Sequence, residues 1–276
     1  MRRLVGWARR VGGNAACGPV AVLSGRTEEL VVGAGSLVVK QHPQPVPRAT
    51  LLLADRRRDI FVPPLAASEV GGWPVTLWPR GVPVREADLH GPGPWAAAGG
   101  LLATLHRTPA PPGTPPCGAP ARVERALDRL AAGPPGFRSK IICDALGTVR
   151  VPHARPTTLV HGDFHLGQVV SLGGARRLID LDTVGLGDPA WDLARMAAWY
   201  LAGVVPAEAW TVFLTAYGAA GGPAVVPGAD PWPVLDQYAR TLAAQTAALA
   251  VVNQDLDTAE TFVAACRRML TMAGDR

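Results

Sequence analysis

Several residue types are scarce in this chain of 276 residues, and each scarcity excludes a class of protein. The four cysteines lie far apart in the sequence: Cys17, Cys117, Cys143 and Cys266. This spacing predicts neither a zinc site nor a disulfide framework, and it fits a reducing cytoplasm. The most apolar late stretch, 241–252, is too short to cross a bilayer and contains Gln245 and Thr246. We therefore expect a cytoplasmic protein that does not enter a membrane.

Lysine is also scarce, since only Lys40 and Lys140 occur and arginine supplies the remaining positive charge behind the formal net charge of +5. The basic excess lies in residues 1–80, where it would suit a polyanionic ligand. Arginine clusters are nevertheless most often solvated surface. Aromatic residues make up only 6% of the chain and are not interleaved with a basic stripe, so a nucleic-acid partner is not favoured.

The first third of the chain has the pattern of an antiparallel sheet. Apolar, β-branched runs at 20–23, 29–32 and 36–40 are separated by short segments that contain glycine. A helix at 49–59 and another strand at 73–78 are expected next. Helical periods follow, and they predict helices at 95–106, 123–132, 140–146, 191–201, 207–219 and 234–252. We predict two domains, residues 1–81 and 82–276, the first rich in strands and the second in helices.

Three short segments of the second domain carry acidic residues. Residues 160–169 are VHGDFHLGQV, residues 178–182 are LIDLD, and residues 187–194 are GDPAWDLA. In order and spacing these segments resemble the catalytic loop, metal strand and helix start of aminoglycoside phosphotransferases and of related choline-kinase-like and maltokinase-like enzymes. Upstream, residues 102–107 and 37–40 resemble that family's LxxLH helix and its ATP-lysine strand. The likeness extends from about Val20 to Ala194.

The resemblance implies an α+β, bilobal, protein-kinase-like fold with a small antiparallel β-sheet N-lobe and a larger, mostly helical C-lobe. It also implies a phosphotransferase that moves the γ-phosphoryl group of Mg-ATP to a hydroxyl of a small molecule. An aminoglycoside-like antibiotic, a sugar or an amino alcohol would each serve as acceptor. ATP and Mg²⁺ are the implied cofactors, residues 1–81 would bind the nucleotide, and residues 82–276 would supply the catalytic loop and the acceptor site.

The chemistry of phosphoryl transfer assigns roles to these residues, since it needs a group that orients the hydroxyl, oxygen ligands for Mg²⁺ and cations for the phosphates. Asp163 would orient the attacking hydroxyl. Gln168 and Asp180 offer the hard oxygen ligands that Mg²⁺ prefers, and a strand over 178–182 would point Asp182 to the same side as Asp180. Lys40 would reach the phosphates, although it would also suit the protection of an edge strand. Backbone N–H groups over the phosphates would come from one short loop: Ser24, Gly25, Arg26 and Thr27.

Four further residues fit structural support better than catalysis. Asp188 stands before Pro189, where it would cap a helix, and Asp192 lies in the first turn, where negative charge is favoured. The family likeness also implies that Asp192 braces the catalytic loop. His161 and His165 are expected to act as hydrogen-bonding scaffold rather than as an acid or base.

Two departures from the family pattern leave an alternative open. Gln168 stands where the family usually has Asn, in an HLGQ form that resembles maltokinase-like relatives. The helix after Lys40 contains no glutamate to pair with it, and Asp55 or Asp59 would have to substitute. A catalytically silent ATP-binding pseudokinase is therefore the second hypothesis. A protein kinase is disfavoured, since Gly162 replaces an arginine and the DFG and APE motifs are absent.

Overall fold

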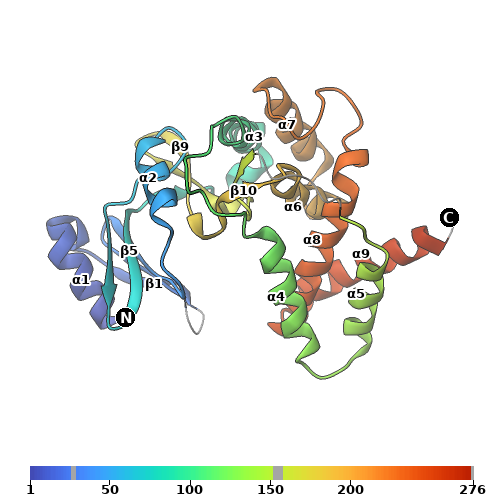
Figure 1. Ribbon diagram of the computed structural model, residues 1–276, viewed down its shortest axis with the longest axis horizontal. Coiled ribbons are helices and arrows are strands. Elements are labelled where there is room, and N and C mark those ends of the chain that lie inside the picture. Colours follow the sequence, from blue (N-terminus) through green and yellow to red (C-terminus); the bar gives the residue numbers. More distant parts are fainter. Residues whose placement is uncertain (26–28, 152–157, 275–276) are drawn as a thin grey trace. The chain divides into compact units, whose positions relative to one another are not determined.

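A computed structural model describes residues 1–25, 29–151 and 158–274 (Figure 1). Contacts divide the chain into two compact units. Unit 1 comprises Met1–Glu86, Pro111–Thr114 and Gly167–Asp182, and unit 2 comprises Ala87–Ala110, Pro115–Leu166 and Thr183–Arg276. The units are not contiguous in the chain, because unit 1 includes two segments that come after the first part of unit 2. The division into 1–81 and 82–276 stays a prediction.

Unit 1 is built on a five-stranded antiparallel sheet with the strand order β1-β2-β3-β5-β4. The strands are β1 (Val20–Gly25), β2 (Leu30–Ala34), β3 (Leu37–Gln41), β4 (Ala66–Val70) and β5 (Trp73–Pro79). The predicted hairpin is present, and β2 and β3 meet at a tight turn where Gly35 has a φ of 59°. Such a positive φ favours glycine.

One face of this sheet is covered by α1 (Arg2–Gly12). Leu37 and Val39 of β3 are buried on that face with Trp7 of the helix, whereas the alternate residues of β3, including Lys40, point to the other face. The sequence analysis did not predict α1. Its apolar residues Leu4, Val5, Trp7 and Ala8 are buried, and its arginines lie near its two ends.

Unit 1 also contains α2 (Arg48–Arg56) and a three-stranded sheet of β6 (Val82–Pro83), β8 (Val169–Leu172) and β9 (Ala175–Leu178). Backbone hydrogen bonds of Leu178 with Ile60 and Val62 attach β9 to the segment after α2. The expectation of a strand over 178–182 is wrong beyond Leu178. The strand ends there, Asp180 has a φ of 63°, and residues 181–183 form a short 3₁₀ turn.

Unit 2 is mainly helical. Its helices are α3 (Pro92–His106), α4 (Ala119–Ala131), α5 (Phe137–Gly147), α6 (Ala190–Leu201), α7 (Ala207–Ala219), α8 (Trp232–Val252) and α9 (Leu256–Gly274). α8 packs against α4, α5, α6 and α9, and α3 packs against α7. Two short strands, β7 (Thr158–Val160) and β10 (Gly185–Gly187), pair antiparallel beside these helices. No helix in the described part of the chain is long and apolar enough to cross a membrane.

The predicted helices of this unit are present, and proline marks the start of several. α3, α4 and α8 each have a proline in their first two positions, where the missing N–H costs no hydrogen bond. α9 was not predicted.

Candidate active site

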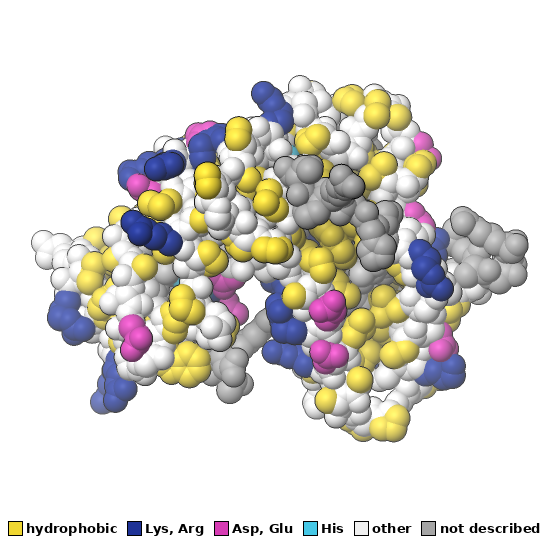
Figure 2. Space-filling view, in the orientation of Figure 1, with side chains coloured by type: hydrophobic (Ala, Val, Ile, Leu, Met, Phe, Trp, Pro, Cys, Tyr) yellow, Lys and Arg dark blue, Asp and Glu magenta, His cyan; other side chains and the backbone are white. Residues whose placement is uncertain are grey.

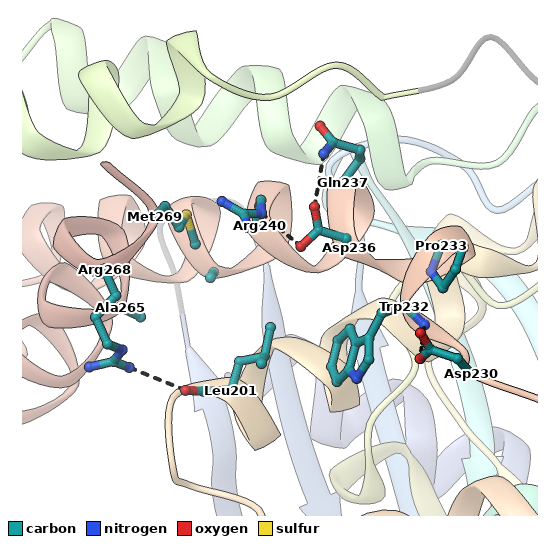
Figure 3. A pocket seen from close by; sticks show the side chains of 11 residues that line it. Leu201, Asp230, Trp232, Pro233, Asp236, Gln237, Arg240, Ala265, Arg268 and Met269 are labelled. Atoms are coloured by element: carbon teal, nitrogen blue, oxygen red, sulfur yellow. Dashed lines mark hydrogen bonds and ion pairs between the residues drawn. The ribbon is translucent and has the colours of Figure 1, made fainter. Parts of the chain in front are cut away.

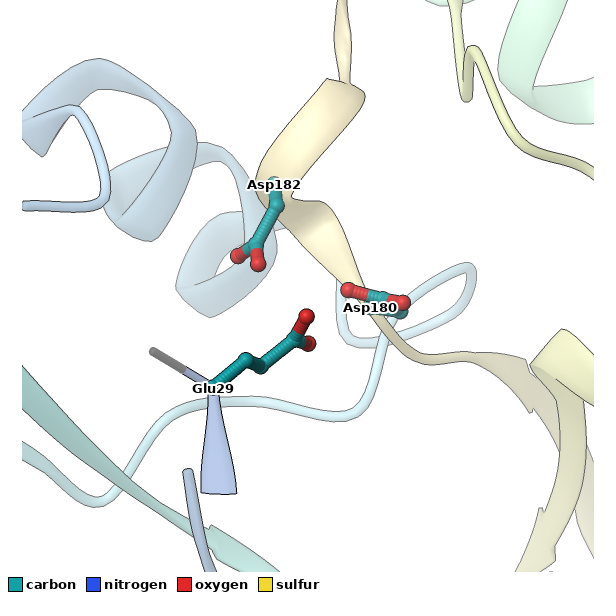
Figure 4. A group of neighbouring side chains, drawn as sticks. All are labelled: Glu29, Asp180 and Asp182. Carbon is teal, nitrogen blue, oxygen red and sulfur yellow. The ribbon is translucent and has the colours of Figure 1, made fainter. Parts of the chain in front are cut away.

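Unit 1 gathers charged side chains around the ammonium of Lys40. Its Nζ lies 2.6 Å from Asp180 Oδ1, 2.8 Å from Asp182 Oδ2 and 2.9 Å from Glu29 Oε1. Figure 4 shows that the three carboxylates point toward one another. Only 10% of the lysine side chain is exposed, so these ion pairs are largely shielded from solvent.

Strand register explains why Glu29 reaches Lys40. Lys40 lies opposite Val31 on β2, and Glu29 precedes Val31 by two residues. The two charged side chains are therefore on the same face of the sheet, as diagonal neighbours across the strands. The family pattern places this carboxylate in the helix after Lys40, so Glu29 was not predicted. Glu29 could have been predicted from the register of the β2–β3 hairpin, which places it near Lys40.

The proposed substitutes for the missing glutamate are engaged elsewhere. Asp55 lies in α2, is exposed and pairs with Arg58. Asp59 pairs with Arg57 at 2.7 Å, which lowers the pKa of the Asp59 carboxyl. Neither provides the counter-ion that was expected of it.

Asp182 has a second partner in this cluster besides Lys40. Its Oδ1 lies 3.0 Å from Nδ1 of His42, a buried side chain whose Nε2 is 2.7 Å from Thr76 Oγ1. Burial acts to raise the pKa of Asp182, but the hydrogen bond from His42 and the charge of Lys40 outweigh it and lower this pKa. Burial likewise acts to lower the pKa of Lys40, yet the charges of Asp180 and Asp182 raise it above the ordinary value. Asp182 and Lys40 are therefore both charged at neutral pH.

The donor set suits a divalent cation with hard oxygen ligands. Glu29, Asp180 and Asp182 each offer a carboxylate oxygen, and these atoms lie within 4.8 Å of one another. Gln168 is buried and contacts Asp180 at 3.3 Å through its amide nitrogen. A half-turn of that amide would present its oxygen instead, the atom that ligates metals. The structure thus brings Lys40, Gln168, Asp180 and Asp182 together in unit 1.

The predicted phosphate loop is only partly described. Ser24 and Gly25 are the last residues of β1, and both are exposed. Arg26 and Thr27 lie outside the described residues. The role of this loop stays a prediction.

Asp163 lies in unit 2, on the loop that follows β7. The preceding residue, Gly162, has a φ of 79°, and a Cβ there would lie 2.6 Å from the carbonyl oxygen of Thr183. Only glycine fits this turn. The carboxylate of Asp163 is 7% exposed and is held by two arginines: its Oδ2 lies 2.6 Å from Arg122 of α4 and its Oδ1 lies 2.7 Å from Arg195 of α6. Sequence analysis predicted neither arginine.

Asp192 lies beneath this loop and is fully buried. It accepts hydrogen bonds from the backbone N–H groups of His161 (2.6 Å) and Gly162 (2.7 Å), and it lies 3.0 Å from Nε2 of His106. Burial acts to raise the pKa of Asp192, but these bonds lower it below the ordinary value. These hydrogen bonds hold the backbone of the loop at His161 and Gly162.

Asp188 contacts the start of α6 and the neighbouring helix. Its carboxylate accepts from the N–H of Ala190 at 2.8 Å and from the hydroxyl of Tyr238 at 2.8 Å. The first bond satisfies a free N–H at the helix start, as a capping residue does. Asp188 thus has the contacts of a structural residue.

His165 gives the loop a pH-dependent stability. Burial lowers its pKa from the ordinary 6.5 to about 4, although Asp163 acts in the opposite direction. Between pH 6.5 and pH 4 the imidazole of His165 is protonated in the unfolded chain but neutral in the folded protein. The free energy of unfolding therefore falls as the pH drops through this range. Wild type loses free energy of unfolding when the pH falls from 7 to 4.5. We expect the loss in His165→Gln to be smaller by about 2 kcal/mol, a value reduced to allow for the partial exposure of the ring. Urea unfolding at both pH values measures this difference, and equal losses in the two proteins would contradict it.

A separate cavity of about 600 Å³ lies in unit 2 at the end of α6, between α8 and α9 (Figure 3). Its charged side chains are already paired within the protein. Asp236 contacts Arg240 at 2.8 Å, and Asp230 accepts from the N–H of Trp232 at 3.1 Å. Arg268 donates to a backbone carbonyl of the α6 end at 3.2 Å. The cavity therefore has no excess of acidic groups in the residues that line it.

Comparison with known proteins places these sites in a family context. The sequence profile described as "Phosphotransferase enzyme family" matches residues 22–236. No curated protein sequence gives a significant match to the chain.

Three solved structures illustrate the likeness in fold. A thermostable mutant of aminoglycoside phosphotransferase APH(4)-Ia in its apo form has a TM-score of 0.69 and 15% identity, over 95% of this chain and 97% of that one. A choline/ethanolamine kinase family protein from Mesorhizobium loti has a TM-score of 0.64 and 18% identity, over 97% and 95%. The macrolide 2′-phosphotransferase MphH from Brachybacterium faecium has a TM-score of 0.58 and 19% identity, over 96% and 98%. The predicted α+β, protein-kinase-like fold class is confirmed.

Proposed function

Because the chain belongs to the phosphotransferase enzyme family, we propose that it transfers the γ-phosphoryl group of Mg-ATP to a hydroxyl group of a small molecule. The family predicted from the sequence motifs is confirmed by this match, whereas the maltokinase-like form of the loop stays a prediction. A neighbouring structure of the APH(4)-Ia enzyme is a ternary complex with AMP-PNP and hygromycin B, which supports an adenine nucleotide and a small-molecule acceptor here.

The observation that carries the proposal is the contact between Lys40 and Asp180. These residues are 140 positions apart in the sequence, yet their charged atoms lie 2.6 Å apart. A lysine next to oxygen ligands for a metal is what a bound triphosphate needs, because phosphates require cations and the metal requires carboxylates. Glu29 supports the same proposal, since it gives Lys40 a counter-ion that the sequence had seemed to lack.

In the proposed reaction the acceptor hydroxyl oxygen forms a bond to the γ-phosphorus. The bond from that phosphorus to the β,γ-bridging oxygen breaks, and its electron pair leaves with ADP. Asp163 orients the hydroxyl and accepts its proton. Lys40 holds the phosphates, and Asp192 fixes the loop that carries Asp163.

Asp180 and Gln168 are the proposed ligands for Mg²⁺, with Asp182 or Glu29 as a further oxygen donor. Bound there, the ion would neutralise charge on the phosphates. Lys40 forms ion pairs with all three carboxylates, so a cation that entered the cluster would share them with the ammonium.

The proposal is tested by ADP release in Mg-ATP with a panel of hydroxyl compounds, with mass spectrometry of the product. We expect Asp180→Asn to raise the Mg²⁺ concentration for half-maximal rate by more than about tenfold, since weakened ligand sets commonly cost 10- to 100-fold in metal affinity. Asparagine tolerates the positive φ at this position, so the backbone is kept. Glu69→Gln, an exposed change on β4 of the same unit, is the matched control.

The pseudokinase hypothesis predicts a different outcome. Mg-ATP would then stabilise the protein against heat, but no ADP would be released with any acceptor. The same experiment therefore separates the two hypotheses.

A further inference from the structure

We propose that Arg122 and Arg195 form an anion-recognition subsite, so that the acceptor is a hydroxyl compound that also carries a carboxylate or phosphate group. This inference rests on the proposed function and adds the chemical class of the acceptor. It excludes a polycationic acceptor as the preferred one.

The first observation is the distribution of charge around Asp163. Each of its two carboxylate oxygens has its own guanidinium partner, at 2.6 Å and 2.7 Å. One carboxylate cannot neutralise two guanidinium groups. The neighbouring Asp192 adds a negative charge that also acts on Arg195, but its oxygens already accept hydrogen bonds from two backbone N–H groups and contact His106.

Arg195 provides the second observation, which is unmet hydrogen-bonding capacity. Its side chain is 11% exposed, and within the described part of the chain its buried Nε has no hydrogen-bond partner. A further contact of this guanidinium, to the amide oxygen of Gln245, is long at 3.4 Å. Burial lowers the pKa of Arg195, which indicates that the protein alone compensates its charge incompletely. A second anion beside it would complete that compensation.

Arg122 is placed to exchange partners. Its side chain is 27% exposed, so it reaches solvent as well as Asp163. An acceptor hydroxyl has to approach the carboxylate that Arg122 now holds. If the acceptor carries its own anionic group, the guanidinium can move to that group and free the carboxylate for the hydroxyl, with a bidentate geometry that suits carboxylate and phosphate.

The surface of α4 extends this basic character. Arg125 and Arg129 follow Arg122 by three and seven residues, so the three lie on one side of the helix, and the latter two are exposed. Figure 2 shows Lys and Arg side chains gathered along one side of α4. An anionic acceptor would be attracted to this side, and a polyamine would be repelled.

The large cavity of unit 2 does not offer an acidic alternative. Its two carboxylates, Asp230 and Asp236, are satisfied by a helix start and by Arg240. Asp255 similarly accepts from the N–H of Thr258 at the start of α9. All three of these carboxylates therefore already have a partner within unit 2.

The test uses four compounds with one carbon skeleton and different charge: glucose, gluconate, glucose 6-phosphate and glucosamine. Phosphoryl transfer from Mg-ATP and calorimetric binding are measured for each. We expect kcat/KM and affinity to be highest for an anionic member, and lowest for glucosamine. Comparison of gluconate with glucose 6-phosphate shows which anion the subsite prefers.

Arg122→Gln should lower kcat/KM for the anionic compounds by about 10- to 100-fold, mostly through KM, because a charged hydrogen bond is lost. The value for glucose should fall by a smaller factor, since glucose loses only the effect of Arg122 on Asp163, and the KM of ATP should change by less than about threefold. Arg122→Lys, which keeps the charge without the bidentate fork, should recover part of the loss. Arg138→Gln, the same change at an exposed arginine of α5 in the same unit, is the matched control.

The inference is overturned if glucosamine is the best acceptor, if Arg122→Gln affects glucose and gluconate equally, or if the KM of ATP rises instead. It is also overturned if wild type binds neither anionic compound in the calorimeter. The proposed function fails separately, when neither the wild type nor the Asp163→Asn variant transfers phosphate to any compound of the broader panel.

Discussion

Asp163→Asn is expected to lower kcat by about 10²- to 10⁴-fold, the range found when a positioned acid or base is removed. The substitution keeps the shape of the side chain but removes the charge that accepts the hydroxyl proton. Because Arg122 and Arg195 would lose their partner, the KM of the acceptor should change as well. Steady-state kinetics at saturating Mg-ATP measures both quantities.

The control for this variant has to separate chemistry from folding. Removal of a buried carboxylate leaves Arg195 uncompensated, which costs several kcal/mol in comparable pairs, about 3–5. The rates are therefore compared at a temperature where circular dichroism shows both proteins folded. Asp144→Asn is the matched control, since Asp144 is an exposed carboxylate paired with Lys140 on α5. A kcat within threefold of wild type for Asp163→Asn would remove Asp163 from the mechanism.

Asp192→Ala should destabilise the protein by about 3–5 kcal/mol. The variant leaves two buried N–H groups without an acceptor and deprives His106 of its partner. Urea unfolding measures the free energy of unfolding. The activity should fall together with the free energy of unfolding, because the backbone of His161 and Gly162 sets the position of the loop that carries Asp163.

Two further variants sharpen this prediction. Asp192→Asn keeps one acceptor oxygen, so its loss should be smaller than that of the alanine variant. Asp257→Ala removes an exposed carboxylate in the first turn of α9 and should cost less than about 1 kcal/mol. If Asp192→Ala were as stable as Asp257→Ala, the loop would not depend on Asp192.

The sequence predicted best those elements whose signal is local. Apolar, β-branched runs on either side of a glycine turn predicted the hairpin of β2 and β3, and proline and helical periods predicted most helices of unit 2. The failures also have local causes. The amphipathic helix α1 was not predicted, and an alternating LIDLD pattern suggested a strand where the chain turns at Asp180.

Only those residues of the candidate site that lie within sequence motifs could be predicted. Lys40, Asp163, Gln168 and Asp180 stand in recognisable segments. Their partners come from elsewhere: Glu29 depends on strand register, and Arg122 and Arg195 depend on how α4 and α6 pack around the loop. Such contacts join residues far apart in the sequence, and no spacing rule within one segment predicts them.

The left-handed backbone of Asp180 restricts which residues can occupy that position. Side chains other than Gly, Asn and Asp seldom adopt a φ of 63°, and a typical one would cost about 1–2 kcal/mol there. Glutamate would keep the negative charge and still be a poor replacement, because the backbone selects against it before any ligand is bound. Among the twenty amino acids, Asp alone combines this tolerance with a carboxylate, so conformation and charge together fix the identity of the residue.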